Sequence, residues 1–143
     1  MRNKIKTRYK FFYLYISLII FDIGLSKRGF SETFKKYSVK YYSKKPVEHI
    51  TENTITEIEE LFYLLNIVCA WYPKKADCIH KTLIGYRILQ SKYSIPVEMV
   101  IGVKKFPFQA HAWLMLDKQD LLLDEGSSEY KVVLSSEKYV QGE

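Results

Sequence analysis

The sequence has few cysteines, few glycines and few prolines, and each scarcity excludes something. Its two cysteines lie nine residues apart without a Cys-x-x-Cys pair, so neither a disulfide framework nor a zinc site is predicted. Six glycines and four prolines fall mostly at predicted breaks between elements. There is no internal repeat and no low-complexity segment. We therefore expect one compact domain in a reducing compartment, with no metal and no cofactor.

Acidic residues are scarce where basic residues gather. Residues 1–10 carry five Lys or Arg and no acid, and residues 27–45 add seven more. A formal net charge of +6 would suit nucleic acid, anionic lipid or an acidic peptide. Because no base-stacking or groove-reading motif accompanies the charge, we expect no nucleic-acid partner. A basic amphipathic N-terminal third is instead typical of contact with a partner protein or a membrane surface.

A long hydrophobic run is also lacking. The apolar stretch 11–21 (FFYLYISLIIF) has no small-residue cleavage site after it, and Asp22 comes next, so it differs from a secretory signal. Its eleven residues are fewer than the roughly 20 that span a bilayer. We predict a buried or interfacial helix within a basic aromatic helical region over 1–50, ahead of a second domain over 51–143.

Two further helices are predicted before residue 96. Thr54 to Glu57 (TITE) has the form of a capping box, and Pro73 closes the apolar stripe that follows. The stripe comprises Leu61, Leu64, Leu65, Val68 and Tyr72. Cys69 beside it is predicted to be a core thiol. Asp77 is a good N-cap for the second helix, which would make Cys78 its first residue.

The C-terminal part is predicted to form strands. Residues 97–103 (VEMVIGV) are rich in β-branched side chains, and residues 109–116 and 121–124 are expected to pair around the polar turn 117–120. Together with the helices, these strands predict an α+β fold with a small antiparallel sheet.

The predicted hairpin brings a histidine and a carboxylate to one face. Its register puts Leu116 opposite Leu121, and Trp113 opposite Asp124. Because opposed residues share a face and side chains alternate along a strand, His111 and Asp124 become diagonal neighbours. Three nearby acids point away or lie too far along the hairpin, namely Asp117, Asp120 and Glu125. The register therefore selects Asp124, and it also puts His111 opposite Gly126.

Cys78, His111 and Asp124 follow one another in the order of a thiol nucleophile, its base and the orienter of that base. At a helix start, the dipole and the free N–H groups favour a thiolate and can receive an oxyanion. Taken singly, a His on a strand or an Asp after one is more often structural. Together and in this order, the three residues predict a Cys-His-Asp catalytic site.

The remaining histidines are weaker candidates for the base. His80 comes two residues after Cys78, so on a helix it points away from the thiol. His49 lies in a polar linker. Trp71 or Tyr72 could line a cleft, although core packing is the simpler prediction for both.

The segment from Cys78 to Gly126 also resembles a known family. It is similar to the transglutaminase-like cysteine peptidases that mature lasso peptides, most specifically at Cys78, at Gly102–Val103 and over Phe108–Trp113. It departs from that pattern at Leu114–Met115, where the family pattern leads us to expect an acid.

The resemblance implies a papain-like fold in which Cys78 is the nucleophile, His111 the general base and then acid, and Asp124 the orienter. It implies hydrolysis between the leader and the core of a ribosomally made precursor peptide in the cytoplasm. The implied partners are the precursor leader peptide, a leader-recognition (RRE) protein and an asparagine-synthetase-like lasso cyclase. Because the sequence has no room for the recognition domain, we expect a standalone peptidase.

Two alternatives stay open at this point. The same triad can transfer the acyl group to an amine instead of water, as a transglutaminase-like acyltransferase does. The chain could also be a noncatalytic adaptor of the maturation complex, with structural roles for its triad-like residues. Peripheral membrane contact through the N-terminal region is a further possibility.

Overall fold

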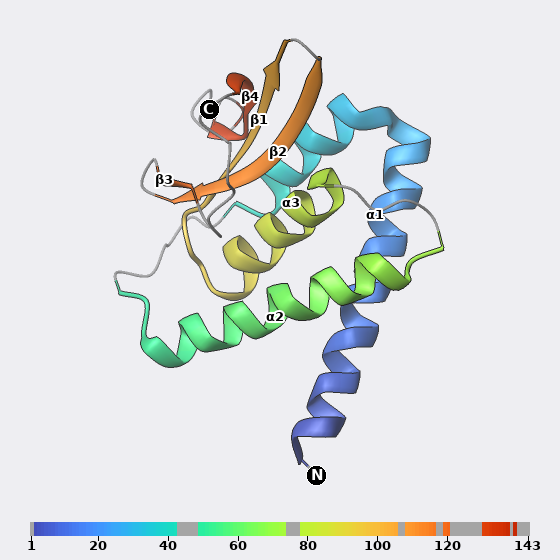
Figure 1. Cartoon of the computed structure of the whole chain (residues 1–143), viewed down its shortest axis with the longest axis vertical. Helices are drawn as coiled ribbons and strands as arrows, with labels where there is room; N and C mark the ends of the chain where they lie inside the picture. The colour runs from blue at the N-terminus through green and yellow to red at the C-terminus, as the bar shows by residue number, and fades with distance from the viewer. Residues whose placement is uncertain are drawn as a thin grey trace.

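Three α-helices and a small antiparallel sheet form the part of the chain that the computed structural model describes (Figure 1). The described residues are 2–42, 49–73, 78–105, 108–116, 119–120, 130–137 and 139. For residues 2–5, 78 and 119–120 the description covers the backbone alone. The helices are α1 (Arg2–Lys40), α2 (Glu52–Trp71) and α3 (Cys78–Arg87), and the π-helical turn η1 (Ile88–Lys92) continues α3.

The sheet holds β1 (Glu98–Lys104), β2 (Gln109–Leu116), β3 (Gln119–Asp120) and β4 (Lys131–Ser135). Their order is β3-β2-β1-β4, and each neighbouring pair is antiparallel. This arrangement confirms the predicted α+β class, with a helix that starts at Cys78 packed on a small antiparallel sheet and a helical N-terminal extension.

The N-terminal helix α1 is longer than the apolar stretch 11–21 and is kinked at Gly29. Gly29 has a φ of 80°, a conformation that side-chain-bearing residues rarely adopt. The hydroxyl of Thr33 donates to the Gly29 carbonyl at 2.8 Å and satisfies an oxygen beside the kink. Apolar side chains of α1 lie in the same core as those of α2 and α3, namely Leu14, Leu18, Phe21, Phe34 and Tyr37. The proposed domain boundary at residue 50 stays a prediction.

Helix α2 begins earlier than the predicted capping box. Its N-cap is Thr51, whose hydroxyl accepts a hydrogen bond from the N–H of Thr54 at 3.2 Å. The box at Thr54 to Glu57 was therefore wrongly placed, because Thr51 already satisfies a free N–H of the first turn. The predicted apolar stripe is confirmed, since Leu61, Leu64, Leu65 and Val68 are all buried. The helix ends at Trp71, two residues before Pro73.

Strands β1 and β2 match the predicted segments, whereas the predicted register of the next strand is wrong. Leu116 pairs with Gln119 and not with Leu121. Only two residues separate the paired positions, which is the shortest common spacing of a hairpin. The difference is two residues, and a shift of two preserves which residues share a face. The pairings predicted for Asp124 and Gly126 fall outside the described residues.

Helix α3 approaches β2 closely because Gly85 has no side chain. A Cβ at this position would lie 2.8 Å from the ring of Phe62 on α2 and 3.0 Å from Leu114 Cδ1 on β2. Both neighbours are buried, so a larger residue would have to displace well-packed atoms. This contact fixes the level at which α3 lies beside β2.

Candidate active site

The backbone of Cys78 lies at the start of α3, which confirms the predicted position of this residue. The first N–H groups of a helix have no acceptor within it, and together with the helix dipole they favour an anion at that end. A thiolate or an oxyanion would gain from this environment. The predicted N-cap Asp77 lies outside the described residues, as does the side chain of Cys78.

His111 lies on β2, directly opposite Gly102 of β1, and is half-buried. Its ring stacks on Trp113, with 5.7 Å between the ring centroids. The ring of Tyr130 also packs against it, with 5.4 Å between the centroids. A Cβ at Gly102 would come within 2.7 Å of the Trp113 ring and 2.8 Å of the Tyr130 Cβ. Gly102, which the family resemblance singled out, therefore makes room for the stack. Tyr130 was not foreseen, because nothing in the local sequence pairs it with β2.

The two faces of β2 carry different residues. Ala112 and Leu114 belong to the main core, and Leu114 meets α3 at Gly85. Because side chains alternate along a strand, His111 and Trp113 project from the other face. The stack with Tyr130 lies on that face.

Cys78 and His111 nevertheless occur at the same end of the α3 and β2 layer. Figure 1 shows α3 and β2 running side by side toward the same end of the molecule, and the two elements are in contact. Cys78 precedes Gly85 by seven residues, or roughly 10 Å of helix. His111 precedes Leu114 by three residues, or roughly 10 Å of strand. The two residues thus lie about equally far along their elements from the Gly85–Leu114 contact, and an encounter of their side chains stays a prediction.

The aromatic stack contains a buried polar atom. Trp113 is 5% exposed, and its indole Nε1 has no hydrogen-bond partner among the atoms that the structure describes. The Tyr130 hydroxyl donates to Gln109 Oε1 at 3.3 Å, and Lys104 Nζ lies 5.2 Å from the Tyr130 ring centroid. These contacts hold the rings around the imidazole of His111 and place a cation beside them.

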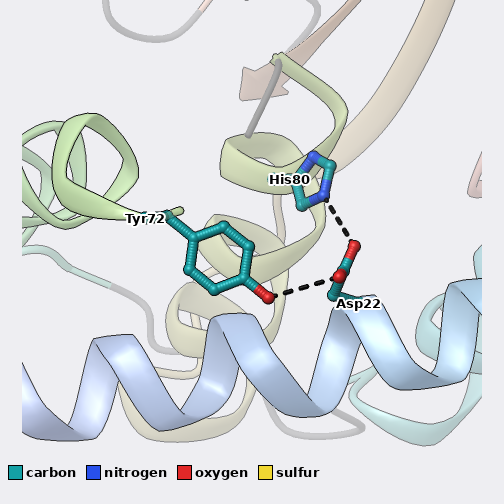
Figure 2. A network of polar contacts seen from close by, with 3 residues as sticks. All are labelled: Asp22, Tyr72 and His80. Carbon is teal, nitrogen blue, oxygen red and sulfur yellow. Dashed lines mark hydrogen bonds and ion pairs between the residues drawn. The ribbon is translucent and has the colours of Figure 1, made fainter. Parts of the chain in front are cut away.

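A polar network on the other side of α3 was not foreseen. Figure 2 shows Asp22 of α1 between two partners. The Tyr72 hydroxyl donates to Asp22 Oδ2 at 3.2 Å, and His80 Nε2 lies 3.5 Å from Asp22 Oδ1. The side chains of His80 and Asp22 are 8% and 14% exposed. Burial and the carboxylate of Asp22 raise the pKa of Tyr72. The available signal in the sequence was an acid, Asp22, directly after the apolar stretch 11–21.

This network assigns a structural role to His80, because it ties the first turn of α3 to α1. Trp71 is 75% exposed, so the core packing predicted for it is wrong, whereas Tyr72 packs partly against the core. Cys69 is buried as predicted, and burial raises the pKa of its thiol. His49 is exposed. Asp124 lies outside the described residues, and its role stays a prediction.

Metal-ligating side chains do not gather in the described part of the chain. No group of three or more His, Cys, Asp or Glu residues there could hold a metal ion.

Comparison with known proteins identifies the family. The family model described as "Transglutaminase-like superfamily" matches residues 24–135, and the chain belongs to this superfamily. The chain is also 29% identical over 113 residues to the microcin J25-processing protein McjB of Escherichia coli. That alignment covers 78% of this chain and 50% of the relative, so the chain spans about half the length of the relative it matches. No solved structure matches the chain.

Proposed function

We propose that this protein is a cysteine peptidase that removes the leader from a lasso-type precursor peptide. The observation that carries the proposal is the position of Cys78 at the start of α3, inside a match to the transglutaminase-like superfamily. Members of that superfamily are usually cysteine-based enzymes. The name of the Escherichia coli relative states that it processes microcin J25, which supports a peptide precursor as the substrate.

In the proposed mechanism, Cys78 is the nucleophile and His111 the general base. The thiolate attacks the carbonyl carbon at the leader–core junction, and N–H groups at the start of α3 receive the developing oxyanion. Protonated His111 gives its proton to the leaving core amine, and the C–N bond breaks to leave a thioester. His111 then accepts a proton from water, whose oxygen attacks the thioester and releases the leader as a carboxylic acid. Asp124 orients the imidazole throughout.

The proposed partners follow from this substrate. They are the precursor leader peptide, a leader-recognition protein that presents it and an asparagine-synthetase-like cyclase that acts on the freed core amine, all in the cytoplasm. The similarity to the microcin J25-processing protein of Escherichia coli supports a place beside other proteins in a maturation pathway.

Mass spectrometry of a lasso-type precursor incubated with this protein and its leader-recognition partner tests the proposal. We expect cleavage at one junction by the wild type and no cleavage by Cys78→Ala. Cys69→Ala is the matched control, because it removes a buried thiol outside the proposed site and should keep cleavage. Normal cleavage by Cys78→Ala would overturn the assignment of the nucleophile. His111→Ala should abolish turnover, and Asp124→Asn should slow it while the protein stays folded.

The superfamily is named after transglutaminases, which transfer an acyl group to an amine. Whether water or an amine accepts the acyl group here therefore needs its own test. Excess of a simple amine is added to the cleavage reaction, and the leader product is weighed. A free carboxylic acid as the main product supports the peptidase. A leader–amine adduct formed as the main product at low amine concentration would instead establish a transferase.

The two thiols of the chain offer an internal test for a noncatalytic adaptor. Burial raises the pKa of Cys69, so at neutral pH its thiolate fraction is small and it should react slowly with iodoacetamide. Cys78 of a peptidase should react much faster than an ordinary exposed thiol and slow down in His111→Ala. If Cys78 reacts no faster than a model thiol, the adaptor interpretation gains support.

A further inference from the structure

The side of α1 that faces away from the core exposes an apolar stripe. Six large side chains, each at least 39% exposed, recur at helical spacing over the first half of the helix. This outer stripe comprises Tyr9, Phe12, Tyr13, Ile16, Ile20 and Ile23. The 15 positions from Tyr9 to Ile23 span roughly 21 Å of helix. A contiguous exposed patch of this kind marks an interaction surface.

Charge is distributed unevenly between α1 and the rest of the chain. Residues 2–40 contain ten Lys or Arg and two acids, whereas residues 41–143 contain twelve Lys or Arg and fourteen acids. The helix thus carries a net charge of +8 and the remainder −2. Exposed cations stand at both ends of the outer stripe, with Lys6 and Arg8 before it and Lys27 and Arg28 after it. An apolar strip between cationic ends is typical of a helix that binds an anionic lipid surface.

Helix α1 is the one described helix that is long and apolar enough to cross a membrane, over Lys6–Lys40. Its inner side argues against crossing. Leu14, Leu18 and Phe21 are completely buried in the core with α2 and α3, so a spanning position would remove them from their partners. The geometry suits a helix that lies in the plane of the membrane, with the inner side on the protein and the outer stripe in lipid.

We propose that the outer stripe of α1 docks the protein peripherally on an anionic lipid bilayer. Self-association through the same stripe would bring two helices of net charge +8 together, which repulsion disfavours. An anionic bilayer suits both parts of this surface, because its acyl chains take up the apolar stripe and its headgroups attract the cationic ends. The inference does not depend on the peptidase activity, because none of the stripe residues belongs to the proposed catalytic site.

Vesicle flotation of the full chain tests the proposal. We expect the protein to float with vesicles that mix phosphatidylcholine and phosphatidylglycerol, to bind less to pure phosphatidylcholine, and to bind less as salt rises. The double variant Phe12→Glu/Ile16→Glu should bind about tenfold more weakly or worse, since it buries two charges in place of two apolar side chains. The matched control is Tyr63→Glu on α2, a residue 67% exposed and outside the stripe. Because all these side chains are exposed, circular dichroism should show a wild-type fold for both.

Three results would overturn the proposal. The first is no flotation with the anionic vesicles, and the second is equal binding by Phe12→Glu/Ile16→Glu and wild type. The third is a wild-type dimer in sedimentation that the double variant dissociates, since the stripe would then be covered by a second copy. The second result has one further reading. If the double variant keeps vesicle binding but no longer binds a leader-recognition protein, the stripe is a protein interface.

Discussion

The two sides of α3 contact their neighbours through different chemistry. Toward the sheet, Gly85 lets the helix approach Leu114 of β2, beside Phe62 of α2, and the contact is apolar and tight. Toward α1, His80 and Asp22 meet in a buried polar contact that also includes Tyr72. Each contact lies within about two turns of Cys78, so both act on the helix whose start carries the proposed nucleophile.

We expect one side of α3 to contribute mainly to the stability of the fold and the other mainly to the orientation of the helix. Apolar burial is non-directional and scales with area, so the sheet side should contribute most of the free energy of unfolding. A buried polar contact gives little net stability but requires defined positions of its atoms. The α1 side should therefore fix the rotation of α3 about its axis more than it stabilises the fold, and substitutions on the two sides should separate these effects.

The largest loss of stability is expected on the sheet side from Leu114→Ala. Leu114 is 4% exposed and touches α3, so truncation removes buried methyl groups and leaves a cavity. We expect the free energy of unfolding to fall by about 2–5 kcal/mol in urea titrations. Val133→Ala on β4, at a residue 56% exposed, is the control and should change little. Equal losses in the two variants would contradict the view that this face forms the main core.

Gly85→Ala should have the next largest effect. Alanine favours a helix by about 1 kcal/mol over glycine, but its Cβ would meet two buried side chains at 3.0 Å or less. Overpacking costs about 1–3 kcal/mol, so we expect a net loss of stability. Gly24→Ala in α1 is the matched control, since its Cβ would meet only the guanidinium end of Arg28, which can move. Thermal unfolding should show a lower midpoint for the first variant and an equal or higher one for the second.

These contrasts also show what the sequence could predict. Periodic apolar positions and β-branched runs are local signals, and they located the stripe of α2 and strands β1 and β2. The start of α3 at Cys78 followed from the break before it. The Asp22–His80 contact joins residues 58 apart in the chain, and no local pattern connects them. The position of Tyr130 over His111 depends likewise on strand pairing at a distance.

The errors have similar physical origins. Two threonines three residues apart, Thr51 and Thr54, are both good caps, and the choice between them depends on where the preceding chain leaves the helix. The register after β2 depends on loop length, which composition does not determine. In the candidate site, the helix position of Cys78 is confirmed, whereas the roles of Cys78, His111 and Asp124 stay predictions.

On the α1 side, Asp22→Asn should lower the free energy of unfolding less than Leu114→Ala or Gly85→Ala does. The amide keeps one acceptor for Tyr72 or His80 but removes the charge that both partners face. We expect a loss of about 1 kcal/mol in the free energy of unfolding. If the network orients α3, the alkylation rate of Cys78 should change as well, while Tyr63→Glu leaves that rate unchanged. A loss as large as that of Leu114→Ala would show that the polar contact is a main source of stability.

Tyr72→Phe should have the smallest effect, and it isolates one bond of the network. The variant keeps the ring that packs edge-on against Tyr15, with 5.7 Å between centroids, and removes only the hydroxyl that donates to Asp22 at 3.2 Å. A hydrogen bond to a charged group contributes about 1.5–3 kcal/mol, and the partial exposure of Tyr72 reduces the expected loss to below about 1 kcal/mol here. Because Asp22→Asn weakens the same bond, the double variant should lose less than the sum of the single losses. Additive losses in urea unfolding would mean that the two residues act independently, and the orientation of α3 would then rest on the contact between His80 and Asp22 alone.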